Sequence, residues 1–178
     1  PIAFLAANNF SLKTFSRVTK QILNVKRAFP ELILAFVLLP ITGLGPLTGT
    51  LAVGIHSIGT LGKLSSEVIE GIDEGPLESI KSSGGSKLNE LFFGVIPQVM
   101  PTITSYGLYR FEINLRASAV LGVVGAGGVG AELFNQLRFR DFPRAGTVLV
   151  VTIVMDLIVD AISAAIRRRI IKGRDIKV

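Results

Sequence analysis

Ionisable side chains that interrupt long apolar runs are the residues of this chain whose chemistry most needs an explanation. Arg110, Glu112 and Arg116 lie in or at the edge of such a run. A charge within a membrane is expensive and usually faces a water-filled cavity or a partner of opposite charge. Two interpretations stay open: a cationic ring that an anion passes on its way across the membrane, or internal ion pairs. In the second, Glu112 would neutralise one arginine, and Asp156 or Asp160 would provide another partner.

The other ionisable residues of the apolar runs favour structural roles. Asp156 and Asp160 are four residues apart and share one helix face, which suits an anchor bonded to arginine or to backbone groups. His56 is the single histidine, and it fits a core residue with satisfied hydrogen bonds better than a proton relay. With no cysteine in the chain, disulfides and thiolate metal sites are excluded. Because no catalytic constellation appears, we expect no enzyme activity and no metal or cofactor on this chain.

A glycine cluster has the spacing of a dinucleotide-binding fingerprint, with Gly125, Gly127 and Gly130 as its glycines and Gly128 among them. That fingerprint belongs to a strand–turn–helix unit that continues into a further strand. The next apolar run, Ala145–Ile166, instead has the length of a membrane-spanning helix. Two readings remain for the cluster: a broken helix or tight turn at an outer gate, or close packing of helices through small residues.

The composition indicates that the solvent of this chain is a lipid bilayer. Hydrophobic residues make up 49% and charged residues 18% of the chain, whereas a soluble domain carries about a quarter charged residues. The net charge is +6, and the lysines and arginines lie in the breaks between apolar runs and in the tail. This is typical of cytoplasmic loops and not of nucleic-acid binding, which needs a basic stripe interleaved with stacking aromatic residues.

The apolar runs predict an all-α, polytopic membrane protein. A basic amphipathic helix at residues 8–30 comes first, and residues 1–178 form a single membrane domain. The apolar stretch that begins at Pro1 reads as the end of an earlier span, so we expect the domain to be incomplete at its N-terminus. The predicted spans are Glu31–Leu44, extended by residues on either side, Leu47–Ile69, Leu91–Leu108 and Ala145–Ile166.

The positions of the basic residues give a topology for these spans. Two crossings after residues 8–30 place the polar stretch 70–87 on the cytoplasmic side, and two more place the C-terminal tail there. The same scheme puts Arg138–Arg144 outside, against the usual bias of basic residues toward the cytoplasm.

A spaced motif starts in the polar stretch and runs into the next span. Glu78 is followed six residues later by Gly84, and Pro97 comes thirteen residues after that. This spacing resembles the "EAA" loop of binding-protein-dependent ABC importer permeases, whose signature is Glu-Ala-Ala, three residues, Gly, nine residues, Ile, one residue, Leu-Pro. The positions that depart from the signature are Ser79, Ile80, Gly94 and Ile96.

The motif also makes mechanical sense without the resemblance. A short amphipathic helix around Glu78 and Ser79 can dock in the groove of a soluble partner, and Gly84 with Gly85 supplies a sharp turn. Ile96-Pro97 then begins the next membrane helix, so the segment about 70–97 would act as a rigid lever. The alternative is an ordinary polar loop between two spans.

The longer run from Gly43 to Ile171 closely resembles the phosphonate importer permeases. The phrases that carry the resemblance include GLGPLTGTLA, IHSIGTLGKLSSEVIEGIDEGPLESI, GVIPQVMP and SYGLYRFEINLRASAVLGVVGAGGVG. The resemblance implies the five-helix core of the methionine-importer type, with the first helix or helices largely absent from this chain. It also implies alternating access for phosphonate or a related phosphorus oxyanion, in which the lever moves with the ATPases.

The same resemblance implies a set of partners and functional residues. The partners are a second permease copy, two cytoplasmic ATPase subunits that bind ATP and Mg, and a periplasmic binding protein, at the inner membrane of a bacterium. An ion-driven transporter would need inverted repeats, which we do not find, and a scaffold would have no reason to hold arginine within a span. The expected sites are ATPase coupling at Glu78, Ser79, Gly84, Gly85, Ile96 and Pro97, the pathway at Arg110, Glu112 and Arg116, and a gate or close packing at Gly125, Gly127, Gly128 and Gly130.

Overall fold

The computed structural model describes residues 2–7 and 13–175, and its regular structure within them is helical, without strands. The all-α prediction is therefore confirmed for this part of the chain. Pro1, Asn8 and the last residues of the basic tail lie outside it. The elements are α1 (Ile2–Ala6), α2 (Lys13–Ala28), α3 (Glu31–Thr42), α4 (Pro46–Glu70), α5 (Gly75–Ser82), α6 (Lys87–Asn89), a π-helical turn (Glu90–Val95), α7 (Ile96–Val123), α8 (Gly128–Arg138) and α9 (Phe142–Asp175).

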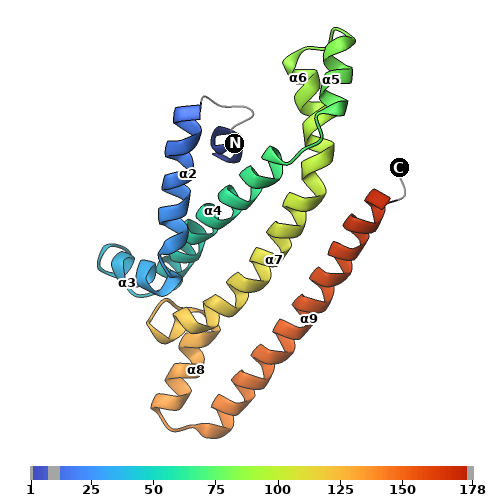
Figure 1. Ribbon diagram of the computed structural model, residues 1–178. Coiled ribbons are helices and arrows are strands. Elements are labelled where there is room, and N and C mark those ends of the chain that lie inside the picture. The colour runs from blue at the N-terminus through green and yellow to red at the C-terminus, as the bar shows by residue number, and fades with distance from the viewer. Residues whose placement is uncertain (1, 8–12, 176–178) are drawn as a thin grey trace.

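Three long helices set the shape of the molecule. Figure 1 shows α4, α7 and α9 as long rods, with α7 between the other two, and α2 running beside α4. The short helices α5 and α6 project at one end, where the described chain also starts and finishes, and α8 folds back at the other end. The two connections that the sequence places on one side, α4–α5 and the C-terminal tail, thus lie at the same end of the bundle.

Proline and glycine decide where the first helices break. Pro30 separates α2 from α3, and Gly43 and Gly45, both with positive φ, form the turn that precedes Pro46. Helix α3 consequently has only 12 residues, about 18 Å at 1.5 Å per residue, which is too short to cross the hydrocarbon core. The predicted span begins at Glu31 as expected, but the extension expected on either side does not continue the helix, because Pro30 precedes it and the glycine turn follows Thr42.

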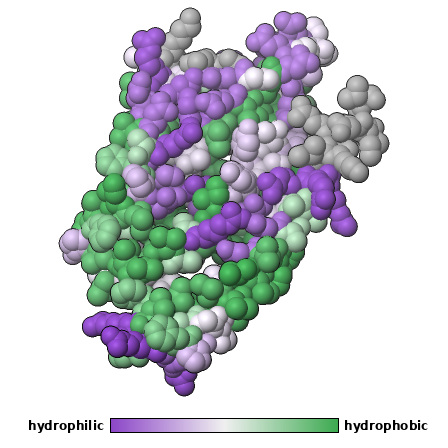
Figure 2. All heavy atoms as spheres, turned by 60° about the horizontal axis from the view of Figure 1, so that its bottom comes forward, coloured by the Kyte–Doolittle hydropathy of each residue, from purple (hydrophilic) through white to green (hydrophobic). Residues whose placement is uncertain are grey.

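Two stretches of the described chain, Lys87–Arg138 and Phe142–Ile170, are long and apolar enough to cross a membrane. Helix α4 has 25 residues and sufficient length, but it is less apolar and packs against α1, α2, α3 and α7. Helix α4 is rich in small residues, and small residues let neighbouring helices pack closely against it. The face seen in Figure 2 carries broad hydrophobic areas, with hydrophilic residues at its top and bottom and also across its middle.

Helix α7 corrects the prediction that its apolar span ends at Leu108. It continues to Val123, so Arg110, Glu112 and Arg116 lie in the middle of one helix. The sequence left open whether these charges lie in a span or at its edge, and the structure places them inside the helix. The helix continues because each of these charges has a partner on a neighbouring helix.

The glycine cluster makes the sharp reversal from α7 to α8. Gly125, Gly127 and Gly128 have positive φ, a conformation that is easy only for glycine. A Cβ on Gly130 would overlap the backbone carbonyl of Ala119, so α8 can lie this close to α7 only through glycine. An added Cβ would also lie within 3 Å of Leu44 at Gly125 and of Pro46 at Gly127, whereas at Gly128 the nearest atom is 3.9 Å away. A role of the cluster in a gate stays a prediction.

The contact at Gly130 gives a test of this packing. We expect Gly130→Ala to lower the stability of the detergent-solubilised protein by about 1–3 kcal/mol or more, because backbone must move to admit the methyl group. The matched control is Gly146→Ala on α9, where an added Cβ meets nothing within 4 Å. Thermal melting of both variants checks the prediction, and equal melting temperatures would contradict it.

Candidate functional site

The predicted coupling residues occupy the projecting end of the molecule. Glu78 and Ser79 lie exposed on α5, and Gly84 forms the following turn with a φ of +78° and open space where a side chain would be. Gly85 packs against Ile80 so closely that a Cβ would stand 2.5 Å from its Cγ2 atom. The structure thus holds the tip of the lever in a tight turn that presents α5 outward.

The root of the lever is the first turn of α7 with the π-helical turn before it. Pro97 has no N–H and its ring disfavours a regular preceding turn, and a π-turn is one way for a helix to absorb such a break. Leu77 of α5 is buried against this root in a cluster with Ile69, Val95 and Val99. Ile96 and Pro97 therefore lie at the base of the lever, apart from Glu78 and Gly84 at its free end.

The sequence analysis did not identify Gln98, a polar residue at the root of the lever. Its Oε1 accepts a hydrogen bond from the Asp73 N–H at 2.9 Å, and its Nε2 donates to the Asp73 carbonyl at 3.1 Å and to the Gly94 carbonyl at 2.9 Å. The available signal was a lone amide next to Pro97 at the start of an apolar helix. Its partners are backbone groups, which a search for matching side chains does not reveal.

A hollow of about 640 Å³ lies beside the lever, lined by residues of α1, α5, α6 and the π-helical turn. Its charged residues carry both signs, and one pair among them, Lys81 and Glu90, is 3.8 Å apart. An apolar floor with charges of both signs at the rim is a surface on which a protein segment can dock. The charged lining residues are Glu74, Glu78, Lys81, Lys87 and Glu90.

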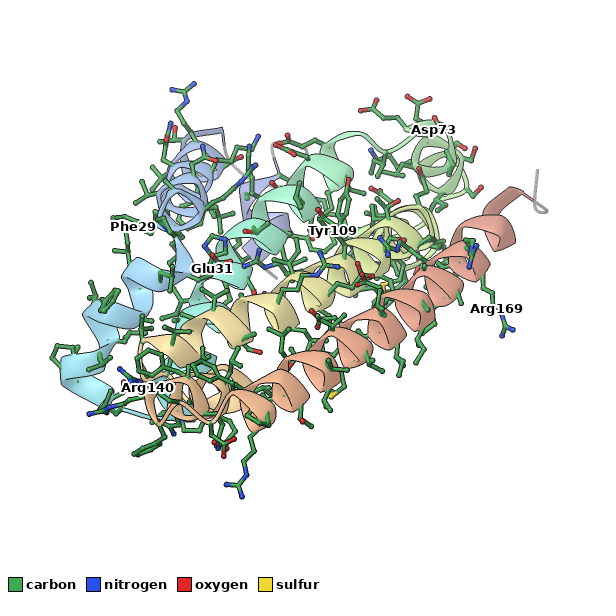
Figure 3. All side chains as sticks on the ribbon, turned by 90° about the horizontal axis from the view of Figure 1, so that it is seen from below. Phe29, Glu31, Asp73, Tyr109, Arg140 and Arg169 are labelled. Atoms are coloured by element: carbon green, nitrogen blue, oxygen red, sulfur yellow. The ribbon has the colours of Figure 1, made fainter. Side chains whose placement is uncertain are left out.

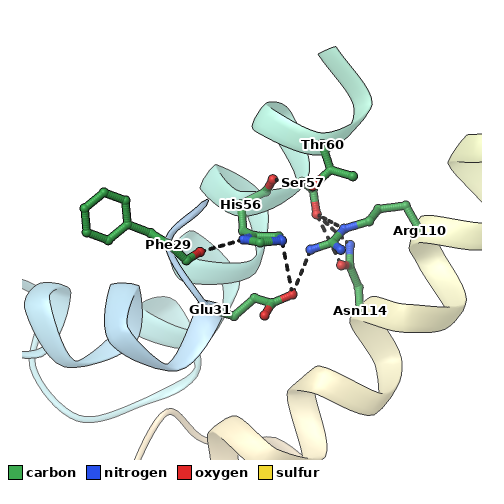
Figure 4. Close-up of polar contacts among 7 residues, drawn as sticks. All are labelled: Phe29, Glu31, His56, Ser57, Thr60, Arg110 and Asn114. Carbon is green, nitrogen blue, oxygen red and sulfur yellow. Dashed lines mark hydrogen bonds and ion pairs between the residues drawn. The ribbon is translucent and has the colours of Figure 1, made fainter. Parts of the chain in front are cut away.

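Arg110 lies in a buried polar network between α3, α4 and α7 (Figure 4). It is 6% exposed, and its Nη2 donates to Glu31 Oε1 at 2.9 Å while its Nε donates to Ser57 Oγ at 3.1 Å. Asn114, one turn further along α7, also bonds to Ser57. In Figure 3 Glu31 is directed inward among the helices, whereas Arg169 points away from the bundle.

His56 belongs to the same network and has partners at both ring nitrogens. Its Nδ1 is 2.9 Å from the Phe29 carbonyl oxygen, and its Nε2 is 3.5 Å from Glu31 Oε1. The expected hydrogen bond of the histidine is confirmed at Nδ1, whereas Nε2 is at ion-pair distance from Glu31 and the ring is half-buried. The network joins the end of α2 to α3 and α4, so it fixes the place where Pro30 breaks the chain.

The other charges of α7 bind α9. Glu112 Oε1 is 2.6 Å from Arg167 Nη2, and Arg116 Nη2 is 2.6 Å from Asp160 Oδ2. The ion-pair interpretation is therefore confirmed for Arg116 and Asp160, whereas the expectation that Glu112 neutralises one of the two α7 arginines is wrong.

Asp156 differs from its neighbour Asp160. Contrary to the expectation of a bonded anchor, it has no hydrogen bond or ion pair within the residues that the structure describes. Arg110 turns to α3 and α4, whereas Arg116 turns to α9, so the expected pathway residues do not form one cationic face in the single chain. Their role in translocation stays a prediction.

Comparison with known proteins gives consistent matches. The family described as "Binding-protein-dependent transport system inner membrane component" matches residues 1–172. The chain is 39% identical over 168 residues to the phosphite transport system permease protein PtxC of Stutzerimonas stutzeri, covering 94% of this chain and 61% of that protein. It is 46% identical over 147 residues to the phosphate-import permease protein PhnE of Mycolicibacterium smegmatis, covering 83% of this chain and 28% of that protein.

A solved structure has the same fold. A chain of the MetNI methionine ABC transporter in an inward-facing conformation superposes with a TM-score of 0.79 at 18% identity, covering 95% of this chain and 82% of that chain. The five-helix importer fold expected from the sequence is supported by this superposition. The chain spans about three fifths of the phosphite permease and less than a third of the phosphate-import permease.

The burial of Arg110 predicts a large effect of removing its carboxylate partner. We expect Glu31→Ala to lower stability by about 3–5 kcal/mol, because it leaves a buried guanidinium without a counter-charge. The control is Glu67→Ala, which removes the exposed carboxylate of an i,i+4 pair with the half-buried Lys63 inside α4 and should change stability by less than ~0.5 kcal/mol. Thermal melting in detergent measures both, and a Glu31 variant as stable as the Glu67 variant would contradict the prediction.

Proposed function

Because the chain belongs to the family of binding-protein-dependent transport system inner membrane components, we propose that it is the membrane-spanning permease subunit of an ATP-driven importer. The observation that carries the proposal is the lever, an exposed helix α5 seated on the first turn of α7. In this role the chain moves a solute and is no enzyme. ATP hydrolysis, with its Mg ion, belongs to a partner ATPase.

The proposed cargo is phosphonate or a closely related phosphorus oxyanion. Relatives at 39% and 46% identity are a phosphite and a phosphate-import permease, and such a cargo is an oxyanion like the carboxylates that Arg110 and Arg116 now bind. An oxyanion in the pathway can take the place of Glu31 or Asp160 on an arginine, since both offer charged oxygen acceptors. Arg167 would take no part in this exchange, because it pairs with Glu112.

The proposed coupling path runs from α5 to α7. Glu78 and Ser79 would enter a groove of the ATPase, with Gly84 and Gly85 allowing the close turn, and the hollow beside α5 would receive part of that partner. Movement of α5 would then reach α7 through Ile96 and Pro97 at the root. If α7 moves as one body, its charged residues and the glycine turn at its end move with it. This movement would give alternating access.

The proposed orientation puts the lever and the C-terminal tail in the cytoplasm of a bacterial cell, with the connection between α8 and α9 outside. It is supported by the common end of these two segments in Figure 1 and by the arginines at positions 167–169 next to that end. A second copy of the chain, two ATPase subunits and a periplasmic binding protein complete the proposed importer. Helix α9, with apolar side chains exposed along most of its length, would face lipid or the second copy.

The importer proposal is tested by co-purification and ATPase activity. The chain is expressed with the ATPase and binding protein encoded beside it, and the detergent-solubilised complex is assayed with methylphosphonate, phosphite and phosphate. We expect an ATPase to co-purify and its rate to rise several-fold with binding protein loaded by one of these oxyanions, but not with the empty binding protein. A chain that purifies alone and lacks ATPase activity under all conditions would favour an ion-driven transporter or a scaffold.

The coupling role of the lever tip is tested at Gly84. We expect Gly84→Asp to insert and assemble but to lose most oxyanion uptake, because a charge would have to be buried unpaired in the ATPase groove. Gly43 gives a matched control, since it has nearly the same φ, +77°, and the same open surroundings at a different turn. Uptake by proteoliposomes is measured for both variants, and normal uptake by Gly84→Asp would remove the lever argument.

A further inference from the structure

Gln98 makes an amide clasp between two parts of the chain that are 25 residues apart in sequence. Its side-chain amide pairs with both backbone groups of Asp73, accepting from the N–H at 2.9 Å and donating to the carbonyl at 3.1 Å. A third bond, from Nε2 to the Gly94 carbonyl at 2.9 Å, fixes the orientation of the amide on its own helix. The clasp is thus a two-point contact with a defined direction.

Asp73 lies in the short linker between the end of α4 at Glu70 and the start of α5 at Gly75. Its own carboxylate Oδ1 accepts a hydrogen bond at 3.0 Å from the N–H of Gly75, the first residue of α5. The backbone of this one residue is therefore held by α7 through Gln98, while its side chain is held by α5. The linker between α4 and α5 therefore cannot change its conformation without breaking one of these hydrogen bonds.

The other contacts between the lever and its root have less directional strength. Lys81 and Glu90 are 3.8 Å apart, which is beyond hydrogen-bond distance, so that pair sets no direction. Leu77 packs on Gly94 and Val95, but an apolar contact permits sliding and rotation. The two hydrogen bonds between the Gln98 amide and the Asp73 backbone resist both motions. The energy of a hydrogen bond falls steeply when donor and acceptor are misaligned.

We propose that Gln98 is a positioning residue that locks the linker between α4 and α5 to the first turn of α7, so that motion of α5 is delivered to α7 and is not absorbed in the linker. The inference rests on the proposed function and deepens it. It assigns the transmission of movement to a residue outside the spaced motif at Glu78, Gly84 and Pro97. Gln98 then determines how much transport each ATP supports, rather than whether ATP is hydrolysed.

The chemistry of the clasp requires a neutral primary amide. Gln98→Glu keeps the shape and the acceptor but loses both donated bonds, and it sets a carboxylate against the carbonyl oxygens of Asp73 and Gly94. Gln98→Ala removes the clasp without adding charge. The matched control is Gln136→Glu, the same change at a glutamine whose amide bonds to Glu132 within α8 and which joins no second element.

The experiment uses the whole complex, with ATPase and binding protein, in proteoliposomes. Oxyanion uptake and ATP hydrolysis are measured together for wild type, Gln98→Glu, Gln98→Ala and Gln136→Glu. We expect both Gln98 variants to hydrolyse ATP at near wild-type rates while uptake per ATP falls about tenfold, and the Gln136 variant to keep the wild-type ratio. An unchanged ratio in an assembled Gln98 variant would overturn the proposal, since a merely stabilising residue alters yield or melting and not this ratio.

A second measurement decides on the clasp independently of transport. Amide hydrogen exchange of the segment around Asp73 is compared in wild type and Gln98→Ala, and we expect its backbone N–H to exchange about tenfold faster in the variant. Equal exchange would overturn the clasp even if uptake per ATP had fallen. A wild-type complex that neither imports nor hydrolyses ATP would overturn the proposed importer function instead, and would leave the exchange result to decide whether Gln98 holds the linker.

Discussion

The charges of α7 are the constraint on which the bundle depends. Arg110 pairs with Glu31 of α3, and Glu112 and Arg116 pair with α9. Because an unpaired charge in an apolar environment costs several kcal/mol, these contacts fix the positions of α3 and α9 relative to α7. Helix α7 is therefore the element that connects every functional part, with the lever at its first turn, the ion pairs along its middle and the glycine reversal at its end.

The same pairs that stabilise the bundle suit a transport cycle. Under the proposed function, an incoming oxyanion would offer the same kind of acceptor as the carboxylate partners of Arg110 and Arg116, so cargo would replace a protein carboxylate with little change in local charge. Such an exchange needs α7 to move against α3 and α9. The proposed source of that movement is the lever, and its directional attachment to α7 is through backbone hydrogen bonds and not through apolar packing alone.

Sequence reasoning predicted the helical class, the short helix and glycine turn that form the tip of the lever, and the tight turn at the glycine cluster, because each leaves a local pattern. It failed where the deciding partner is distant in sequence. The continuation of α7 beyond Leu108 depends on Glu31, Asp160 and Arg167. Asp160 was expected as a possible partner of an arginine, but no spacing links Glu31 or Arg167 to α7. The clasp at Gln98 was missed because its partner is a backbone, and the break of the first span follows from Pro30 and Gly43 acting together.

The departures of the lever from the family signature also have a physical account in the fold. The signature has Ala where this chain has Ile80, and Ile where it has Gly94. In the structure a Cβ on Gly94 would lie 3.4 Å from Ile80 Cδ1 and 3.0 Å from Leu77 Cδ1, so the larger side chain of α5 occupies the space that the glycine leaves open. The two substitutions compensate in volume, which is how packed cores tolerate exchanges. The root of the lever is thereby kept filled, and the spacing from Glu78 to Pro97 retains its mechanical meaning despite the partial match of residues.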